Sequence, residues 1–195
     1  MNTKIENIYQ EVYELFPKSI ELRRDKYRER DWIFPNHILI SIKISKELCK
    51  KYNGNQDICK LALLLHDCGL VYKRGDSPKG HEERSVEYAE IVLKKYNFSK
   101  EEIEEVIKCI KATDPKNTIE LINEKIVRSS DALSQINSLH FFAKAYFSDE
   151  FDFFVNWLKN KLPKNLDKIC FDDEKSKAEK IIKFYIKLVN DYNSI

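Results

Sequence analysis

The sequence predicts an all-α protein built as a helical bundle. Its 195 residues include only four glycines and five prolines, and no segment alternates apolar and polar residues between turn signals as a strand does. Apolar residues instead recur at helical spacing along the chain. With 43% hydrophobic residues, a chain of this length can bury one sizeable core. We therefore expect a single helical domain over residues 1–195.

The first half of the chain carries four stretches with helical patterns, at residues 5–16, 35–52, 55–67 and 81–96. Pro17 is expected to end the first helix, because proline interrupts the hydrogen-bond ladder. The third helix begins at cap-forming residues and ends in the dipeptide His66–Asp67. Gly69 is expected to be its C′ residue.

Four more helical patterns follow in the second half. "SKEE" at residues 99–102 is a capping box that opens a helix, and this helix has to stop before Pro115. The remaining helices have the following expected limits: from Asn117 or Thr118 as cap to Leu133, residues 141–162 with a break near Asp149, and residues 174–192.

The composition argues against several classes of protein. Charged residues make up 34% of the chain but nearly cancel, to a formal charge of +2, whereas a nucleic-acid binder carries a strong basic excess. No segment reaches the roughly 20 apolar residues of a membrane span, and the N-terminus lacks the apolar stretch of a signal peptide. The five cysteines are scattered without a CxxC pair, which favours small core residues of a reduced protein. We expect a cytoplasmic protein that contacts neither nucleic acid nor membrane.

The stretch "LALLLHDCG" is the strongest indication of function. Its first five residues are apolar on every side, as in a helix buried all round, and an ionised Asp67 at the end of such a helix needs a partner. His66 precedes it, and His37 and Asp131 lie on other predicted helices. Two imidazoles and two carboxylates suit a divalent first-row metal with open positions for water and substrate. The alternative is a surface position for His37 and a hydrogen-bonded core position for His66, without a metal.

In their order along the chain, these four residues resemble the H…HD…D signature of the HD-domain superfamily. "HEERS" after the HD turn and "EKIVRSSDALSQI" around the last aspartate are similar to the corresponding stretches of small single-domain bacterial members. The resemblance covers about residues 33–135, the metal-site core, and implies a helical bundle of the HD-domain type on which helices over residues 140–195 pack. It also implies a metal-dependent phosphohydrolase.

The chain departs from the family pattern at several positions. Ser129 stands where members often carry a second acid, and Leu70 stands where many carry a lysine after the HD turn. His81 matches the first of the additional histidines that hold a second metal in cyclic-dinucleotide phosphodiesterases, but the later histidines are missing from the sequence. The acidic pair of guanosine-tetraphosphate hydrolases is missing after HD as well. The resemblance therefore implies one firmly held divalent ion, with His81 as a second-metal or substrate contact.

By this resemblance, a metal-bound water attacks phosphorus in a small phosphorylated metabolite, for which a nucleotide is the leading candidate. Asp67 is expected to act as a metal ligand and as the base or orienting group for that water, with Glu82 and Asp76 as further candidate bases. The ion is Mn, Fe, Ni, Co, Zn or Mg, because imidazole and carboxylate ligands together accept all of these. The expected phosphate-binding residues lie in the loop and first helical turn after HD: Lys73, Arg74, Lys79 and Arg84.

Two other functions fit the sequence. A non-catalytic helical module would keep metal or nucleotide binding for sensing or as a scaffold, although the intact motif argues against a decayed site. A helical interaction protein would bind no metal. Loss of turnover in Asp67→Ala with the fold intact separates the enzyme from the first alternative, and stabilisation by metal excludes the second. A homodimer is compatible with the sequence, which leaves the oligomeric state open.

Overall fold

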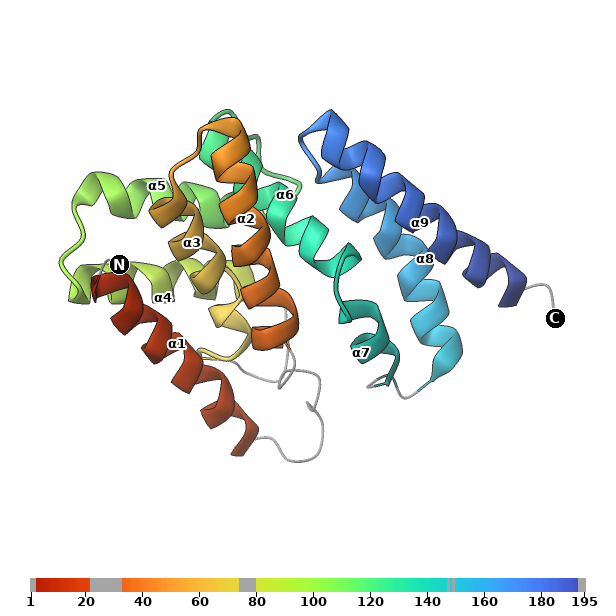
Figure 1. Ribbon diagram of the computed structural model, residues 1–195. Helices are drawn as coiled ribbons and strands as arrows, with labels where there is room; N and C mark the ends of the chain where they lie inside the picture. The colour runs from red at the N-terminus through yellow and green to blue at the C-terminus, as the bar shows by residue number, and fades with distance from the viewer. Residues whose placement is uncertain (1–2, 22–32, 74–79, 147, 149, 193–195) are drawn as a thin grey trace.

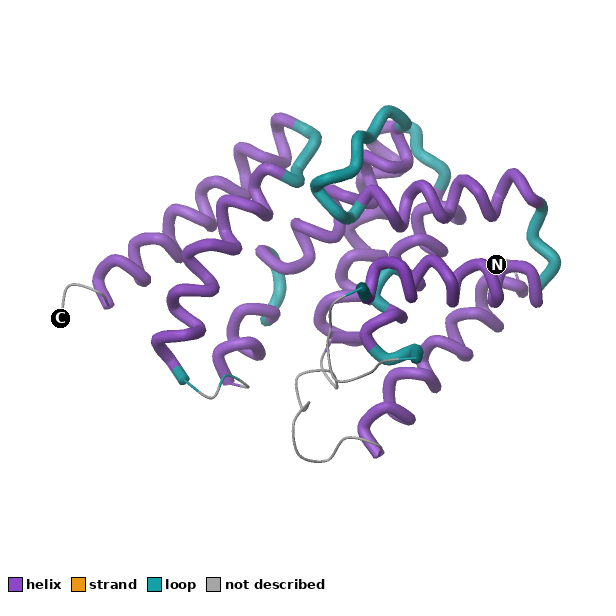
Figure 2. Tube along the Cα trace, turned by 180° about the vertical axis from the view of Figure 1, so that it is seen from behind, coloured by secondary structure: helices purple, strands orange, loops and turns teal. Residues whose placement is uncertain are grey.

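The computed structural model describes residues 3–21, 33–73, 80–146, 148 and 150–192. These residues are mostly helical and contain no strand, so the predicted all-α class is confirmed (Figure 1, Figure 2). In chain order the elements are α1 (Thr3–Glu21), the π-helical turn η2 (Phe34–Ile38), α2 (Leu39–Tyr52), α3 (Gln56–Leu65), the 3-10 turn η3 (Cys68–Leu70), α4 (His81–Lys95), α5 (Lys100–Ala112), α6 (Ile122–Ile136), α7 (His140–Tyr146), α8 (Phe151–Asp167) and α9 (Asp172–Tyr192).

Helix α6 lies at the centre of this arrangement. Every residue from Ile126 to Ile136 is buried. Helices α2, α3 and α5 pack against it, and so do α7, α8 and α9. Figure 1 shows α1 to α5 gathered on one side of α6 and the antiparallel pair α8–α9 on the other. A side chain on α6 can therefore meet groups from both halves of the molecule.

Helix α3 is also enclosed by its neighbours. Its residues Leu61–Leu65 are 0% exposed, as their uninterrupted apolar run predicts. At its start, the Asn55 side chain accepts hydrogen bonds from two backbone N–H groups of the first turn, at 3.0 and 3.2 Å. Burial of each large apolar side chain stabilises the fold by about 1.5–3 kcal/mol. The C-terminal end of α3, which His66 and Asp67 follow directly, is thus held firmly in the interior.

Two predicted helix ends are wrong. Helix α1 continues through Pro17 to Glu21, and α8 continues through Pro163, although the sequence pattern predicts an end at Leu162. A proline inside a helix removes its own backbone donor and strains one turn, but the turns on either side can keep their hydrogen bonds. In α8, Leu162 and Asn165 lie on both sides of the proline and are 0% exposed, so packing outweighs the lost bond.

The predicted start of α6 is wrong as well. Neither Asn117 nor Thr118 caps this helix, which begins at Ile122. The Asn117 side chain instead donates to the Lys111 carbonyl of α5 at 2.8 Å. The carboxylate of Glu124 accepts from the backbone N–H groups of the two residues before the helix, at 2.8 and 3.1 Å. The capping side chain thus lies inside the helix, and a pattern based on a cap residue before the first turn does not reveal it.

Other local predictions are confirmed. The capping box at the start of α5 makes both of its hydrogen bonds, at 3.2 Å to the Ser99 hydroxyl and 2.8 Å to the Glu102 carboxylate. The five cysteines are free, and four of them are buried, whereas Cys170 is partly exposed. Within the described segments, no helix is both long and apolar enough to cross a membrane.

Candidate metal centre

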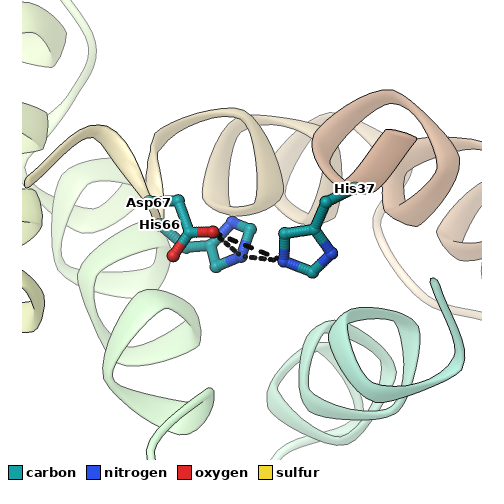
Figure 3. A group of neighbouring side chains, drawn as sticks. All are labelled: His37, His66 and Asp67. Carbon is teal, nitrogen blue, oxygen red and sulfur yellow. Dashed lines mark hydrogen bonds and ion pairs between the residues drawn. The ribbon is translucent and has the colours of Figure 1, made fainter. Parts of the chain in front are cut away.

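Four polar side chains from separate parts of the fold meet beside α6. His37 comes from the π-helical turn before α2, a local geometry often found at functional sites. His66 and Asp67 follow the last residue of α3, and Asp131 lies in the middle of α6. Each of the four is at most 9% exposed. Figure 3 shows His37, His66 and Asp67 turned toward one another.

The reactive atoms of these side chains surround a common space. The Nε2 atoms of His37 and His66 lie 3.2 Å apart. His37 Nε2 is 3.4 Å from Asp67 Oδ2 and 3.2 Å from Asp131 Oδ1. His66 Nε2 is 3.5 and 3.7 Å from the same two oxygens. Two imidazole nitrogens and one oxygen from each aspartate therefore face a single point.

Hydrogen bonds behind the two rings determine which nitrogen carries the proton. The Ser134 hydroxyl donates to the Asp131 carbonyl at 2.8 Å, so at 2.7 Å it accepts from the Nδ1–H of His37. The Nδ1–H of His66 donates to the Leu63 carbonyl at 2.8 Å. Each neutral ring then presents the lone pair of Nε2 to the centre. This arrangement is typical of metal-binding histidines.

The centre attracts positive charge. Two Nε2 lone pairs and two carboxylate oxygens repel one another unless a cation lies between them. Burial lowers the pKa of His37, but hydrogen bonds and charges from Asp131 and Asp67 outweigh it and raise the pKa to about 9. The pKa of His66 is also raised, against the effect of burial, by the same two aspartates. His37, His66 and Asp67 form a group that could hold a metal ion, and a divalent ion fits the whole donor set.

Asp131 divides its two oxygens between the centre and α8. Burial opposes its ionisation, but the charge of Lys168 and the hydrogen bonds of the two histidines hold the pKa well below its usual range. Lys168 donates to Oδ2 at 2.8 Å, and Gln135 Nε2 donates to Oδ1 at 3.3 Å. The pKa of Asp67 is lowered as well, because the charges of His66 and His37 outweigh its burial. Both aspartates are thus ionised and paired.

The turn after HD is packed against the start of α4. The Gly69 backbone N–H donates to the Ser85 hydroxyl at 2.9 Å, and Arg84 Nε donates to the Gly69 carbonyl at 3.0 Å. Gly69 is not the predicted C′ residue, because it lies in a 3-10 turn and its φ is not positive. It is required for space, since a Cβ there would lie 2.0 Å from the His81 carbonyl oxygen. This close approach brings His81 Nε2 to 3.8 Å from Asp67 Oδ1.

The centre opens into a polar pocket of about 260 Å³. One part of its wall carries the acidic residues Asp67, Glu82 and Asp114, and another part is formed by α8. The complete lining consists of His37, His66, Asp67, His81, Glu82, Thr113, Asp114, Pro115, Asp131, Gln135, Lys161, Lys164, Asn165 and Lys168.

The two predicted phosphate-binding residues that the structure describes, Lys73 and Arg84, do not line this pocket. Lys73 is exposed, and its amine is hydrogen-bonded to the carboxylate of Glu87. The Arg84 guanidinium supports the HD turn through Gly69 and is not part of the pocket lining. Three further predicted site residues lie outside the described segments: Arg74, Asp76 and Lys79. Phosphate binding by the loop after HD stays a prediction.

The other predicted contacts lie in the pocket. His81 and Glu82 both line it, and His81 Nδ1 is 3.1 Å from Glu82 Oε2. His81 is thus placed between Glu82 and Asp67. The predicted roles of Glu82 as a base and of His81 as a metal or substrate contact fit these positions and stay predictions.

Several pocket residues are not predicted from the sequence. Lys161, Lys164 and Lys168 repeat at helical spacing, which is the signal that could have found them. The expected helix end at Leu162 separates them, however, so the pattern is missed. The ring of His140, which the sequence does not connect with the motif, lies 5.4 Å from that of His37 between centroids.

Comparison with known proteins agrees with this geometry. The HD domain family model matches residues 35–136. The structure is similar to that of Bacillus subtilis YpgQ, with 20% identity, a TM-score of 0.66, and coverage of 98% of this chain and 95% of that one. It is also similar to a Lactobacillus plantarum protein, with 13% identity, a TM-score of 0.70, and coverage of 100% and 97%. A search of curated proteins gives no significant match. At these identities the solved structures establish a shared fold over nearly the whole chain.

Proposed function

Because the chain belongs to the HD-domain family, whose members are typically metal-dependent phosphohydrolases, we propose that it hydrolyses a small phosphorylated metabolite such as a nucleotide. The observation that carries this proposal is the contact of 3.2 Å between the Nε2 atoms of His37 and His66, beside oxygens of Asp67 and Asp131. A buried cluster of hydrogen-bond acceptors at this spacing is a site for a cation. The open pocket beside it leaves room for a substrate.

His37, His66, Asp67 and Asp131 would hold the ion. When bound, a divalent metal lowers the pKa of water and polarises a phosphoryl oxygen. The protein's own contribution is to orient the ligands, since Ser134 and the backbone behind His66 keep each Nε2 directed at the centre. Imidazole and carboxylate ligands accept Mn, Fe, Ni, Co, Zn or Mg.

Asp67 and His81 would take part in the transfer of the proton from the attacking water. Asp67 Oδ2 faces the two histidines, whereas Oδ1 points toward His81 at 3.8 Å. Asp67 can therefore serve as a ligand through one oxygen and orient or deprotonate the attacking water with the other. Glu82 is in contact with His81 and provides a second proton acceptor at the pocket.

Phosphorus NMR tests this proposal directly. Purified protein is given nucleoside mono-, di- and triphosphates with manganese, with magnesium and with a chelator, and His66→Ala serves as the inactive variant. We expect phosphate or pyrophosphate release only with metal and only from the wild type, with loss of at least about 100-fold in the variant because the ligand set is broken. Equal release by His66→Ala would contradict the proposal. Metal binding without any turnover would favour the non-catalytic sensor or scaffold.

A further inference from the structure

We propose that the C-terminal part of α8 and its C-cap residue, through Lys161, Lys164 and Lys168 and called here the lysine face, bind the phosphate chain of a substrate with at least two phosphate groups. This inference rests on the proposed function and narrows its substrate class to nucleoside di- or triphosphates or similar chains, as opposed to monophosphates.

The three lysines form a row along the pocket. They are spaced i, i+3 and i+7: Lys161 and Lys164 lie on α8, and Lys168 is its C-cap residue with helical backbone angles, so all three lie on one side of the helix. All three line the pocket beside the metal centre. At 1.5 Å per residue the row covers about 10 Å along the helix axis. Lys161 and Lys168 are half-buried, whereas Lys164 is exposed. Both ends of the row are therefore partly buried, and its middle residue, Lys164, reaches the mouth of the pocket.

The positive charge of the lysine face is only partly neutralised by the protein. Lys168 pairs with Asp131 at 2.8 Å. Within the described part of the chain, no carboxylate lies within ion-pair distance of Lys161 or Lys164. Burial lowers the pKa of Lys161, and the charge of Lys168 lowers it further in spite of attraction from Asp131 and Asp67. A bound anion would remove this repulsion between ammonium groups.

The distribution of charge around the pocket places a phosphate chain against α8. The four acidic lining residues lie outside α8, where they repel phosphate and attract cations: Asp67, Glu82, Asp114 and Asp131. A single phosphate at the centre would lie next to Lys168, which already contacts Asp131. Lys164 at the pocket mouth would gain a partner only from negative charge that extends outward from the centre. A chain of two or three phosphates meets this condition.

A buried amide on the same helix supports a ligand at this position. Asn165 lies between Lys161 and Lys168 and is 0% exposed. Its Nδ2 donates to Gln135 Oε1 at 3.1 Å, but its Oδ1 has no hydrogen-bond partner among the described residues. A buried acceptor without a donor is uncommon in folded proteins. A hydroxyl group on the substrate or an ordered water beside it would supply the missing donor.

Binding measurements without turnover test the lysine face. Inorganic tripolyphosphate and inorganic orthophosphate are titrated by calorimetry into the full chain in the presence of a chelator. We expect tripolyphosphate to bind at least about tenfold more tightly than orthophosphate, because it contacts more than one ammonium group. Lys161→Ala and Lys164→Ala should each weaken tripolyphosphate binding about fivefold. Lys159→Ala, an exposed position on α8 outside the pocket lining, is the matched control and should leave the affinity unchanged.

The possible outcomes separate this inference from the proposed function. Equal affinity for tripolyphosphate and orthophosphate would contradict phosphate-chain binding by the lysine face. A loss of tripolyphosphate affinity in Lys159→Ala as large as in the lysine-face variants would contradict it as well. If tripolyphosphate binding depends on Lys161 and Lys164 while no nucleotide is hydrolysed with metal, the lysine face stands and the hydrolase proposal fails. If nucleotides are hydrolysed but the lysine variants bind tripolyphosphate normally, the hydrolase stands and the lysine face fails.

Discussion

His37 and His66 can present their Nε2 atoms to each other at 3.2 Å because each ring is anchored on its far side. The anchors are a serine hydroxyl and a backbone carbonyl, and neither can rotate freely in the buried interior. Without a cation at the centre, at least one of the two nitrogens has to carry an extra proton to relieve the repulsion. Proton binding and metal binding therefore compete for the same site.

This competition predicts the pH dependence of the metal-free protein. The native state keeps a proton on His37 up to about pH 9, whereas the unfolded chain loses it near 6.5. The stabilising contribution is complete below 6.5 and is lost as the pH rises through 9, so we expect the free energy of unfolding to fall by on the order of 3 kcal/mol over this range. His66, whose pKa is also raised, acts in the same direction.

Urea unfolding of chelator-treated protein across this pH range measures the effect. His37→Gln should remove the part of the slope that is due to His37, because the substituted amide does not titrate, and leave the part due to His66. Added manganese should bind more tightly as the pH rises, because the ion then no longer has to displace protons from its ligands. A wild-type stability that stays constant or increases from pH 6.5 to 9 would show that the histidines are not held as described.

At the scale of secondary-structure elements, the site depends on the close contact between the HD turn and the start of α4. Gly69 permits this contact, and Ser85 and Arg84 secure it with hydrogen bonds to the Gly69 backbone. The segment "HEERS" thus supplies the side chains that hold the start of α4 against the HD turn. Moving α4 outward would separate His81 from Asp67 and open the pocket wall.

Gly69→Ala tests this contact. The added methyl group would lie 2.0 Å from the His81 carbonyl oxygen and 2.6 Å from the Ser85 backbone nitrogen, and neither can move without shifting α4. We expect a loss of about 3 kcal/mol in unfolding free energy, seen as a fall of about 10 °C in melting temperature. Gly80→Ala is the control, because its nearest neighbours are flexible side-chain ends at 3.5 Å and only backbone strain of about 1 kcal/mol applies. Equal melting temperatures for the two variants would exclude a tight contact at Gly69.

The sequence predicts some elements better than others for identifiable reasons. The apolar run of α3 and the capping box of α5 are local signals, and both are found in the structure. The lysine face is not predicted, because Pro163 interrupts the helical pattern that places Lys164 on the same helix as Lys161 and Lys168 at its C-cap. The role of Gly69 depends on a contact with α4, twelve and more residues away, which no local pattern reveals.

At the scale of the whole molecule, the pocket is shared between the HD-matching segment and the helices that follow it. The four candidate metal ligands come from residues 35–136, whereas the lysine face comes from α8 and its C-cap residue. Ser129 is 0% exposed and accepts a hydrogen bond from the Cys170 backbone N–H at 3.0 Å. This bond ties the loop between α8 and α9 to α6. Ser129 thus anchors the C-terminal end of α8 next to the metal centre.

The most direct test of the central claim is electron paramagnetic resonance of Mn²⁺ added to the metal-free protein, with spin-echo detection of nitrogen nuclei near the ion. The structure predicts one tightly bound Mn²⁺ with two histidine nitrogens as ligands, and loss of one nitrogen signal in each of His37→Gln and His66→Gln. Lys159→Ala should leave the spectrum unchanged. A spectrum of weakly bound, fully hydrated Mn²⁺ in the wild type, or nitrogen signals that persist in both histidine variants, would contradict the assignment of this cluster as a metal centre.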